Sequence, residues 1–291
     1  MKKGNRLQKR LNLCAKVNLA LDIVGVEPNG YHILDTIAVN IPVSDQIEVV
    51  VREDRSATVQ YDNGVVYQND TVIRAVQHMI DTYDLPGADV YIKKAIPVGA
   101  GLGGSSADAA GVIKCYLEIF DVVCDMDKLA EVGSDVPYMV FGGACRINGI
   151  GNIVKRVSVP LLYGVVLVDT AVKVDTRLAY SVYDKINGEH NSIDDFLAEK
   201  IPAFNALQRS AISINPQIGG LLDVLRVAGF ENVVMSGSGG GVFGYASTRV
   251  TRDQCLAQLT KLICAKSMLL IPFDTERKNE EAEFGLSGLF V

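Results

Sequence analysis

Residues 97 to 107 form the strongest candidate for chemistry in this sequence. They spell Pro-Val-Gly-Ala-Gly-Leu-Gly-Gly-Ser-Ser-Ala, between a predicted strand and a predicted helix. Glycine allows backbone amides to approach a ligand closely, and free N–H groups at a helix N-terminus attract anions. The stretch therefore predicts a phosphate-binding loop, with Ser105 or Ser106 as the helix N-cap. A tight turn without a ligand is the alternative, but such a turn needs fewer glycines and serines.

Two better-known phosphate loops fit this stretch less well. Gly99, Gly101 and Gly104 satisfy the spacing of the dinucleotide fingerprint. That fingerprint also requires an acidic residue at the end of a second strand, whereas Asp121 and Asp125 fall just past the predicted helix. A P-loop requires glycine followed by lysine, and no such pair occurs in the chain. A P-loop kinase is therefore excluded.

Asp135 is a second candidate, in the run Gly133-Ser-Asp-Val-Pro137. An aspartate shortly before a proline is typical of a helix N-cap, but such a carboxylate could also act as a general base towards a substrate hydroxyl. Two more glycine groups follow, at 142–151 and 237–241. The second of these joins two predicted strands, either as a hairpin loop or as a second wall over a nucleotide. The residues alone leave both questions open.

Composition limits the classes of protein that the chain can belong to. Its 291 residues carry 28 Lys and Arg against 34 Asp and Glu, a net charge of −6, so nucleic-acid binding is not expected. Six scattered cysteines and three separated histidines indicate buried free thiols and no zinc site. No apolar run reaches the ~20 residues of a membrane span, and no signal-peptide core follows the basic start. We expect a cytoplasmic protein without a membrane partner.

Hydrophobic periodicity predicts the elements that position these residues. In the first half we expect strands at 11–23, 35–51, 57–61, 90–96 and 144–147, and helices at 71–83, from 105, at 127–132 and at 136–141. The rhythm changes near Val159-Pro160. In the second half we expect strands at 164–168, 232–235, 242–245 and 268–271, and helices from 175 or 176, around 192–198 and 203–211, at 215–229 and at 254–263. A charged segment at 274–283 is expected to be solvated. The pattern predicts an α+β protein with domains at 1–158 and 159–291.

Five motifs, in this order and at about this spacing, resemble those of the GHMP kinase superfamily. They are Ala15-Lys-Val-Asn-Leu19, Asn29-Gly-Tyr-His32, the glycine loop, Gly133-Ser-Asp-Val-Pro137 and Met235-Ser-Gly-Ser-Gly239. The first two together point to the members that act on 4-diphosphocytidyl-2-C-methyl-D-erythritol. The resemblance implies a two-domain fold, with an N-terminal mixed sheet with helices and a C-terminal ferredoxin-like α/β sandwich.

The resemblance also implies ATP and Mg²⁺ as cofactors and assigns roles to residues. Lys16 would stabilise the transferring phosphoryl group and keep Asp135 charged, while Asp135 would accept the proton of the substrate hydroxyl. Asp70 would lie near the adenine. The triphosphate would be wrapped by Pro97, Val98, Gly99, Ala100, Gly101, Leu102, Gly103, Gly104, Ser105, Ser106 and Ala107.

A small cytidine-diphosphate substrate is the implied second ligand. Tyr31 and Tyr180 would sandwich the cytosine, and His32 would hydrogen-bond its edge. Asn18 would touch the substrate near Lys16, and further contacts would come from Gly237, Ser238 and Gly239. The implied assembly is a monomer or a homodimer.

Four features of the chain depart from the family pattern. Asn152 replaces a common glutamate, and Asp70 stands where an asparagine is expected. The segment before Asp135 is about one helical turn shorter, and Gly240-Gly241 replaces the usual Pro-Thr. Two alternatives stay open: another small-molecule GHMP kinase, for homoserine, mevalonate or a sugar, and a catalytically silent paralogue that binds nucleotide. The presence of both Lys16 and Asp135 favours an active enzyme.

Overall fold

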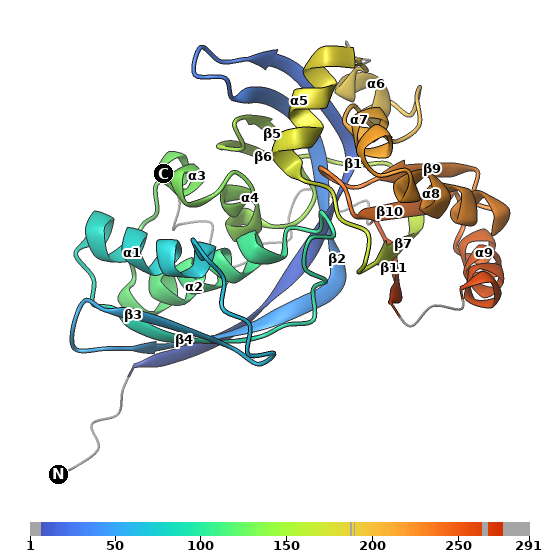
Figure 1. Cartoon of the computed structure of the whole chain (residues 1–291). Coiled ribbons are helices and arrows are strands. Elements are labelled where there is room, and N and C mark those ends of the chain that lie inside the picture. Colours follow the sequence, from blue (N-terminus) through green and yellow to red (C-terminus); the bar gives the residue numbers. More distant parts are fainter. Residues whose placement is uncertain (1–6, 187, 189, 264–266, 276–291) are drawn as a thin grey trace.

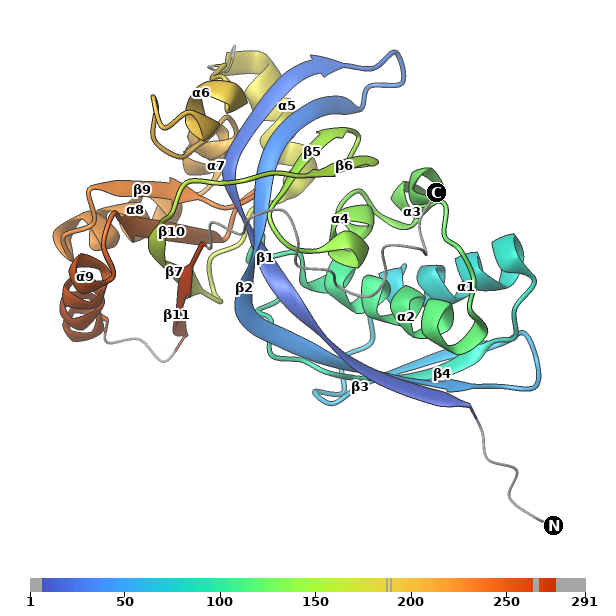
Figure 2. The ribbon, with the colours of Figure 1, turned by 180° about the vertical axis from the view of Figure 1, so that it is seen from behind.

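A long β-hairpin runs through the molecule and connects its two halves (Figure 1). The computed structural model describes residues 7–186, 188, 190–263 and 267–275. β1 (Gln8–Val26) and β2 (His32–Val51) pair antiparallel along almost their whole length. Figure 2 shows the same hairpin from behind, bending between the two halves. Lys16 and Asn18 lie near the middle of β1, so the hairpin carries them to the junction of the halves.

The first sheet is mixed, as the sequence predicts. Its order is β3-β4-β2-β1-β8, and β5 and β6 extend from β2 as a further antiparallel pair. The outer pairs β3 with β4 and β8 with β1 run parallel. The added strands are β3 (Ala57–Tyr61), β4 (Ala88–Lys93), β5 (Cys145–Gly149), β6 (Ile153–Arg156) and β8 (Phe204–Asn205).

Four helices lie on one side of this sheet (Figure 1). They are α1 (Thr71–Tyr83), α2 (Gly104–Phe120), α3 (Met126–Val132) and α4 (Val136–Phe141). α2 packs against the β-hairpin, α1 and α4, and most of its residues are buried. A Cβ at Gly111 would lie 2.9 Å from the Ile47 side chain, so this glycine allows α2 to approach β2 closely. The tight packing fixes the start of α2, where the glycine loop ends.

The second half contains a four-stranded antiparallel sheet in the order β11-β7-β10-β9. Its strands are β7 (Tyr163–Asp169), β9 (Asn232–Met235), β10 (Gly241–Ala246) and β11 (Met268–Asp274). Helices intervene after β7 and after β10, which gives the β-α-β-β-α-β order of a ferredoxin-like unit. The helices are α5 (Thr176–Ile186), α6 (Ile193–Leu197), α7 (Gln208–Ile214), α8 (Gln217–Val227) and α9 (Arg249–Leu262). The α+β class and the ferredoxin-like half are confirmed.

The structure differs from the prediction in several local details. The segment 203–211 is not one helix, because Phe204 and Asn205 pair with β1 and the helix begins only at Gln208. The Asn205 side-chain amide donates to the backbone oxygens of Met235 and Gly237, a tertiary contact that local propensity does not register. Strand β6 was not expected, and Cys14 is exposed. The boundary at 158/159 stays a prediction, and most of the charged segment 274–283 lies outside the described residues.

None of the helices in the described part of the chain has the length and apolar character to cross a membrane.

Candidate active site

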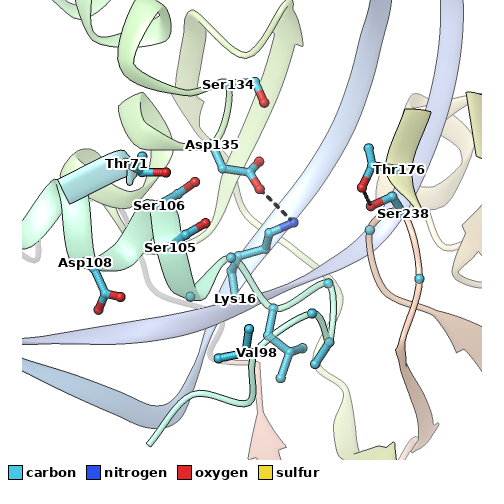
Figure 3. A pocket seen from close by; sticks show the side chains of 18 of the residues that line it. Lys16, Thr71, Val98, Ser105, Ser106, Asp108, Ser134, Asp135, Thr176 and Ser238 are labelled. Carbon is cyan, nitrogen blue, oxygen red and sulfur yellow. Dashed lines mark hydrogen bonds and ion pairs between the residues drawn. The ribbon is translucent and has the colours of Figure 1, made fainter. Parts of the chain in front are cut away.

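Most of the predicted site residues line one cavity of about 460 Å³ between the two halves. The glycine loop forms one wall, and β1 contributes Lys16 and Asn18 at the base. Asp135 closes the cavity from the start of α4, and Thr176 and Ser238 face it from the second half (Figure 3). Segments more than two hundred residues apart therefore meet at this cavity.

Lys16 and Asp135 form an ion pair inside the cavity, with 3.4 Å between Nζ and Oδ2 (Figure 3). Asp135 occupies the N-cap position of α4, but its side chain makes no cap hydrogen bond. Its carboxylate turns instead to Lys16, whose side chain is only 5% exposed, while the Asp135 side chain is 38% exposed. Of the two interpretations left open by the sequence, the side chain does not act as a helix cap and instead faces the cavity. The shorter segment before Asp135 does not turn its carboxylate away from Lys16.

The glycine loop adopts a backbone that side chains rarely tolerate. Gly99, Gly101 and Gly103 have φ values of 78°, 71° and 74°. Gly103 is the N-cap of α2, so the expectation that Ser105 or Ser106 caps this helix is wrong. Both serines lie in the first turn instead and point towards the space near Asp135 and Lys16 (Figure 3). The dipole of a 17-residue helix therefore ends at the cavity together with two hydroxyl groups.

The loop at 237–241 is both a hairpin connection and a wall. It joins β9 to β10, and its backbone lies directly on the first loop: a Cβ at Gly240 would be 2.4 Å from the Gly99 oxygen. Ser238 is hydrogen-bonded to Thr176, with 2.7 Å between the hydroxyl oxygens. The extra glycines Gly240 and Gly241 therefore have a packing reason, because larger residues would separate the two loops.

One end of the cavity is lined by buried acidic and phenolic groups. Asp70 caps α1 through the Val72 amide at 2.8 Å and accepts from the Tyr61 hydroxyl at 3.0 Å. Lys94 is paired with Asp45 and, at 2.6 Å, with Asp108. Burial raises the pKa of Asp108 to about 8, since two carboxylates share one ammonium group in a site with little water.

The residues predicted to bind cytosine are only partly brought together. His32 lies against Tyr180, with ring centroids 4.6 Å apart, and its Nε2 is 2.8 Å from Asp184 Oδ1. Tyr180 lines the cavity, but Tyr31 is 66% exposed at the end of the β1–β2 turn, and neither Tyr31 nor His32 is among the lining residues. Burial and, to a lesser degree, the charge of Asp135 raise the pKa of Tyr180, so its hydroxyl stays protonated.

Sequence reasoning assigned one residue to the site that does not line the cavity, and it missed several residues that do. Ala107, predicted to touch phosphate, is fully buried behind the loop and does not line the cavity. Conversely, Gly151 does line it, and a Cβ there would lie 2.0 Å from the Ser134 oxygen, so this glycine lets the chain pack beneath the residue before Asp135. Missed lining residues with polar side chains include Thr36, Tyr61, Tyr67, Lys94, Asp108 and Thr176. An available signal was the single aspartate in the run Ala107-Asp-Ala-Ala-Gly111 of a buried helix.

Comparison with known families defines the class of this protein. The family of GHMP kinases N terminal domains matches residues 70–153, which include the glycine loop and Asp135. Solved structures with the same fold include homoserine kinase from Cytophaga hutchinsonii, with a TM-score of 0.64, 15% identity and coverage of 95% of this chain and 97% of that chain. The chain therefore has the fold of the GHMP kinases and, over residues 70–153, the sequence of their N-terminal domain.

More similar relatives identify the family within this class. The 4-diphosphocytidyl-2-C-methyl-D-erythritol kinase of Bacteroides fragilis is 33% identical over 248 residues, which cover 80% of this chain and 90% of the relative. That of Bacillus licheniformis is 30% identical over 248 residues, 79% of this chain and 85% of the relative. A crystal structure of 4-(cytidine 5'-diphospho)-2C-methyl-D-erythritol kinase matches with a TM-score of 0.73, 25% identity and coverage of 91% and 98%. The chain belongs to the 4-diphosphocytidyl-2-C-methyl-D-erythritol kinase family, as its motifs predict.

Proposed function

We propose that this protein transfers the γ-phosphate of ATP to a hydroxyl of 4-diphosphocytidyl-2-C-methyl-D-erythritol. The observation that carries the proposal is the Lys16–Asp135 pair, held at the end of the glycine loop in one cavity. A silent paralogue would have no need to keep a buried lysine and a partly exposed aspartate in contact. Family membership supplies the identity of the acceptor.

The nucleotide end of the proposed site is the glycine loop with the start of α2. Backbone amides from residues 97–106 would bind the triphosphate, since all of these residues line the cavity and the loop ends at the start of α2. Ser105 and Ser106 would add hydroxyl groups to the phosphates or to a metal ion. Asp70, held by hydrogen bonds from the Val72 amide and the Tyr61 hydroxyl, would lie beside the adenine.

Phosphoryl transfer requires mainly positioning and charge stabilisation from the protein. Asp135 would accept the proton of the acceptor hydroxyl as that oxygen bonds to the γ-phosphorus, while the bond from phosphorus to the bridging oxygen breaks and ADP leaves with the electron pair. An ammonium group has three donors. Among the described residues, Lys16 Nζ donates to Asn18 and forms an ion pair with Asp135 at 3.4 Å. A remaining donor of this ammonium would bind the phosphoryl oxygens in transit.

The side chains of the cavity fit a magnesium ion bound largely through phosphate. No group of three histidine, cysteine or acidic residues with metal-ligand geometry occurs among the described residues. Mg²⁺ in kinase sites typically takes one or two protein oxygens together with substrate phosphates, and the hydroxyls of Ser105 and Ser106 can supply these. The ion would neutralise phosphate charge there.

The acceptor end is proposed to be built by Asn18, Tyr180 and the loop at 237–239, all of which line the cavity. His32, held by Asp184 and packed against the tilted ring of Tyr180, would hydrogen-bond the cytosine edge. Tyr31 would then close over the base from its exposed position on the turn. The proposal includes a cytoplasmic location, which suits free cysteines, and a monomer or homodimer.

A coupled assay of ADP release tests the proposed function. Wild type and Asp135→Ala are assayed with ATP and, in turn, with the cytidine substrate, homoserine and mevalonate. We expect the wild type to turn over the cytidine substrate but neither homoserine nor mevalonate. The rate of the variant should be at least ~100-fold lower, because general-base catalysis is lost. Wild-type turnover of the cytidine substrate no faster than that of the variant would contradict the proposal.

A further inference from the structure

A row of buried polar side chains lies directly behind Lys16. Lys16 Nζ donates to Asn18 Oδ1 at 2.6 Å, Asn18 Nδ2 donates to Thr36 Oγ1 at 2.9 Å, and Thr36 Oγ1 donates to the Ala20 oxygen at 2.7 Å. Lys16, Asn18 and Thr36 are each less than 5% exposed. The row ends at a backbone carbonyl of β1, so a fixed group anchors it.

The direction of these hydrogen bonds follows from the chemistry of their two ends. A lysine ammonium can only donate, so the Asn18 atom that faces it must be the carbonyl oxygen. A backbone carbonyl can only accept, so the Thr36 hydroxyl must use its proton there and keep lone pairs for Asn18. An Asn18 amide turned by 180° would place donor against donor at Lys16 and would find no donor at Thr36. One orientation therefore satisfies every group.

We propose that Thr36 is a positioning residue for phosphoryl transfer, because its hydroxyl holds the Asn18 amide in the orientation that fixes Lys16. The inference rests on the proposed function of the Lys16–Asp135 pair. Thr36 itself stands one step removed from the reacting atoms. Its effect passes through Asn18 to the ammonium that stabilises the transferring group.

The backbone around Asn18 makes the side chain the adjustable part of this row. The backbone N–H of Asn18 donates to Ser236 Oγ at 3.2 Å, and the backbone N–H of Lys16 donates to the backbone oxygen of Leu102 at 3.0 Å. Both contacts fix β1 against the loops of the cavity. Loss of the Thr36 hydroxyl would therefore free the Asn18 amide to rotate on a backbone that stays in place.

The test compares two substitutions at Thr36 with a matched control. Thr36→Val keeps the shape of the side chain and removes the hydroxyl, whereas Thr36→Ser keeps the hydroxyl. As the control, Thr275→Val makes the same change at another threonine, which is 3% exposed, donates to the Pro160 oxygen and does not line the cavity. We expect kcat of Thr36→Val to fall at least ~10-fold with KM for ATP within ~2-fold of wild type, because the lost contact acts in the transition state. Thr36→Ser and Thr275→Val should stay within ~3-fold of wild-type kcat.

A double-mutant cycle with Asn18→Ala shows whether Thr36 acts through Asn18. In that background the effect of Thr36→Val on kcat should disappear, whereas full additivity would overturn the proposal. An equal loss of kcat in Thr36→Val and Thr36→Ser would overturn it as well. If Thr36→Val does not fold, Thr36→Ala provides the same comparison without the added methyl group.

A readout that needs no turnover separates this inference from the proposed function. Hydrogen exchange of the Asn18 side-chain amide can be followed by NMR, with its signals assigned from their absence in Asn18→Asp. We expect slow exchange in wild type and Thr36→Ser, and fast exchange in Thr36→Val. Unchanged exchange in Thr36→Val would refute the positioning role even if the kinase activity is confirmed. If the exchange rates follow this pattern but the wild-type protein has no kinase activity, the proposed function is refuted and the hydrogen bond from Asn18 to Thr36 is not.

Discussion

Gly101 is the point where the two glycine-rich loops touch, and an alanine there tests whether that contact builds the nucleotide site. Its φ is +71°, and a Cβ would lie 2.6 Å from the backbone oxygens of both Gly239 and Ser236. Cβ atoms in proteins essentially never lie within 3.0 Å of such a neighbouring atom, so at least one of the two loops must move by roughly half an ångström. Gly64 is a matched control, because its φ is +70° and nothing lies within 4 Å of its Cβ position.

Both substitutions place alanine in the left-handed region, which costs about 1–2 kcal/mol in each case. Only Gly101→Ala adds overlap with backbone, and we expect a further loss of about 1–3 kcal/mol in the free energy of unfolding measured with urea. Displaced loop amides should also lower kcat/KM for ATP by ~100-fold, whereas Gly64→Ala should keep kcat/KM near wild type. Equal unfolding free energies and equal kcat/KM in the two variants would refute the reasoning.

Two further predictions concern the ends of the cavity. At the end of the cavity near Asp70, burial raises the pKa of Asp108 to about 8, above its value in the unfolded chain. The unfolded chain therefore loses this proton first, and the folded protein becomes less stable as pH rises from about 4 to about 8. Asp108→Asn should therefore gain stability relative to wild type across that range, by at most about 1.4 kcal/mol per pH unit, in urea unfolding measured at several pH values. At the acceptor end, Tyr31→Ala should raise KM for the cytidine substrate by ~5-fold or more, because stacking on one aromatic ring contributes ~1–3 kcal/mol, and should leave the free energy of unfolding unchanged since Tyr31 is 66% exposed.

Each of these predictions has a control in the same chain. Asp121→Asn makes the same change at an exposed aspartate at the end of α2 and controls for the loss of one negative charge. The same pH dependence in wild type and Asp108→Asn would show that Asp108 is ionised throughout. For Tyr31, the control is KM for ATP, which should not change. An unaltered KM for the cytidine substrate would remove Tyr31 from the site.

Sequence reasoning predicted the elements whose signal is local. The strand at 57–61, the helices at 71–83 and 136–141 and the strand at 232–235 have the predicted bounds, because each buries one face in a regular period or begins at a clear turn or cap. β8 was missed because two residues of Phe204–Asn205 become a strand only by pairing with β1. That pairing spans nearly two hundred residues, and local propensity does not contain it.

The site could be predicted as a set of motifs but not as a geometry. Lys16, Asp135 and the glycine loop were named from their order in the chain, and the structure places them in one cavity. The ion pairs of Lys94 with Asp45 and Asp108, and the place of Thr36 in the site, were not predicted, since the partners come from strands and helices distant in sequence. Gly103 replaced the expected serine cap because its positive φ sets the angle at which the loop enters α2.

The most direct test is the turnover rate of Asp135→Asn with ATP and 4-diphosphocytidyl-2-C-methyl-D-erythritol, measured beside wild type and Asp121→Asn. The amide keeps the shape of the carboxylate but cannot accept the proton of the acceptor hydroxyl. We expect kcat to fall by ~10²–10⁴-fold with KM for ATP within ~2-fold of wild type, and Asp121→Asn to match wild type. Turnover by Asp135→Asn at the wild-type rate would show that the Lys16–Asp135 pair does not carry the reaction.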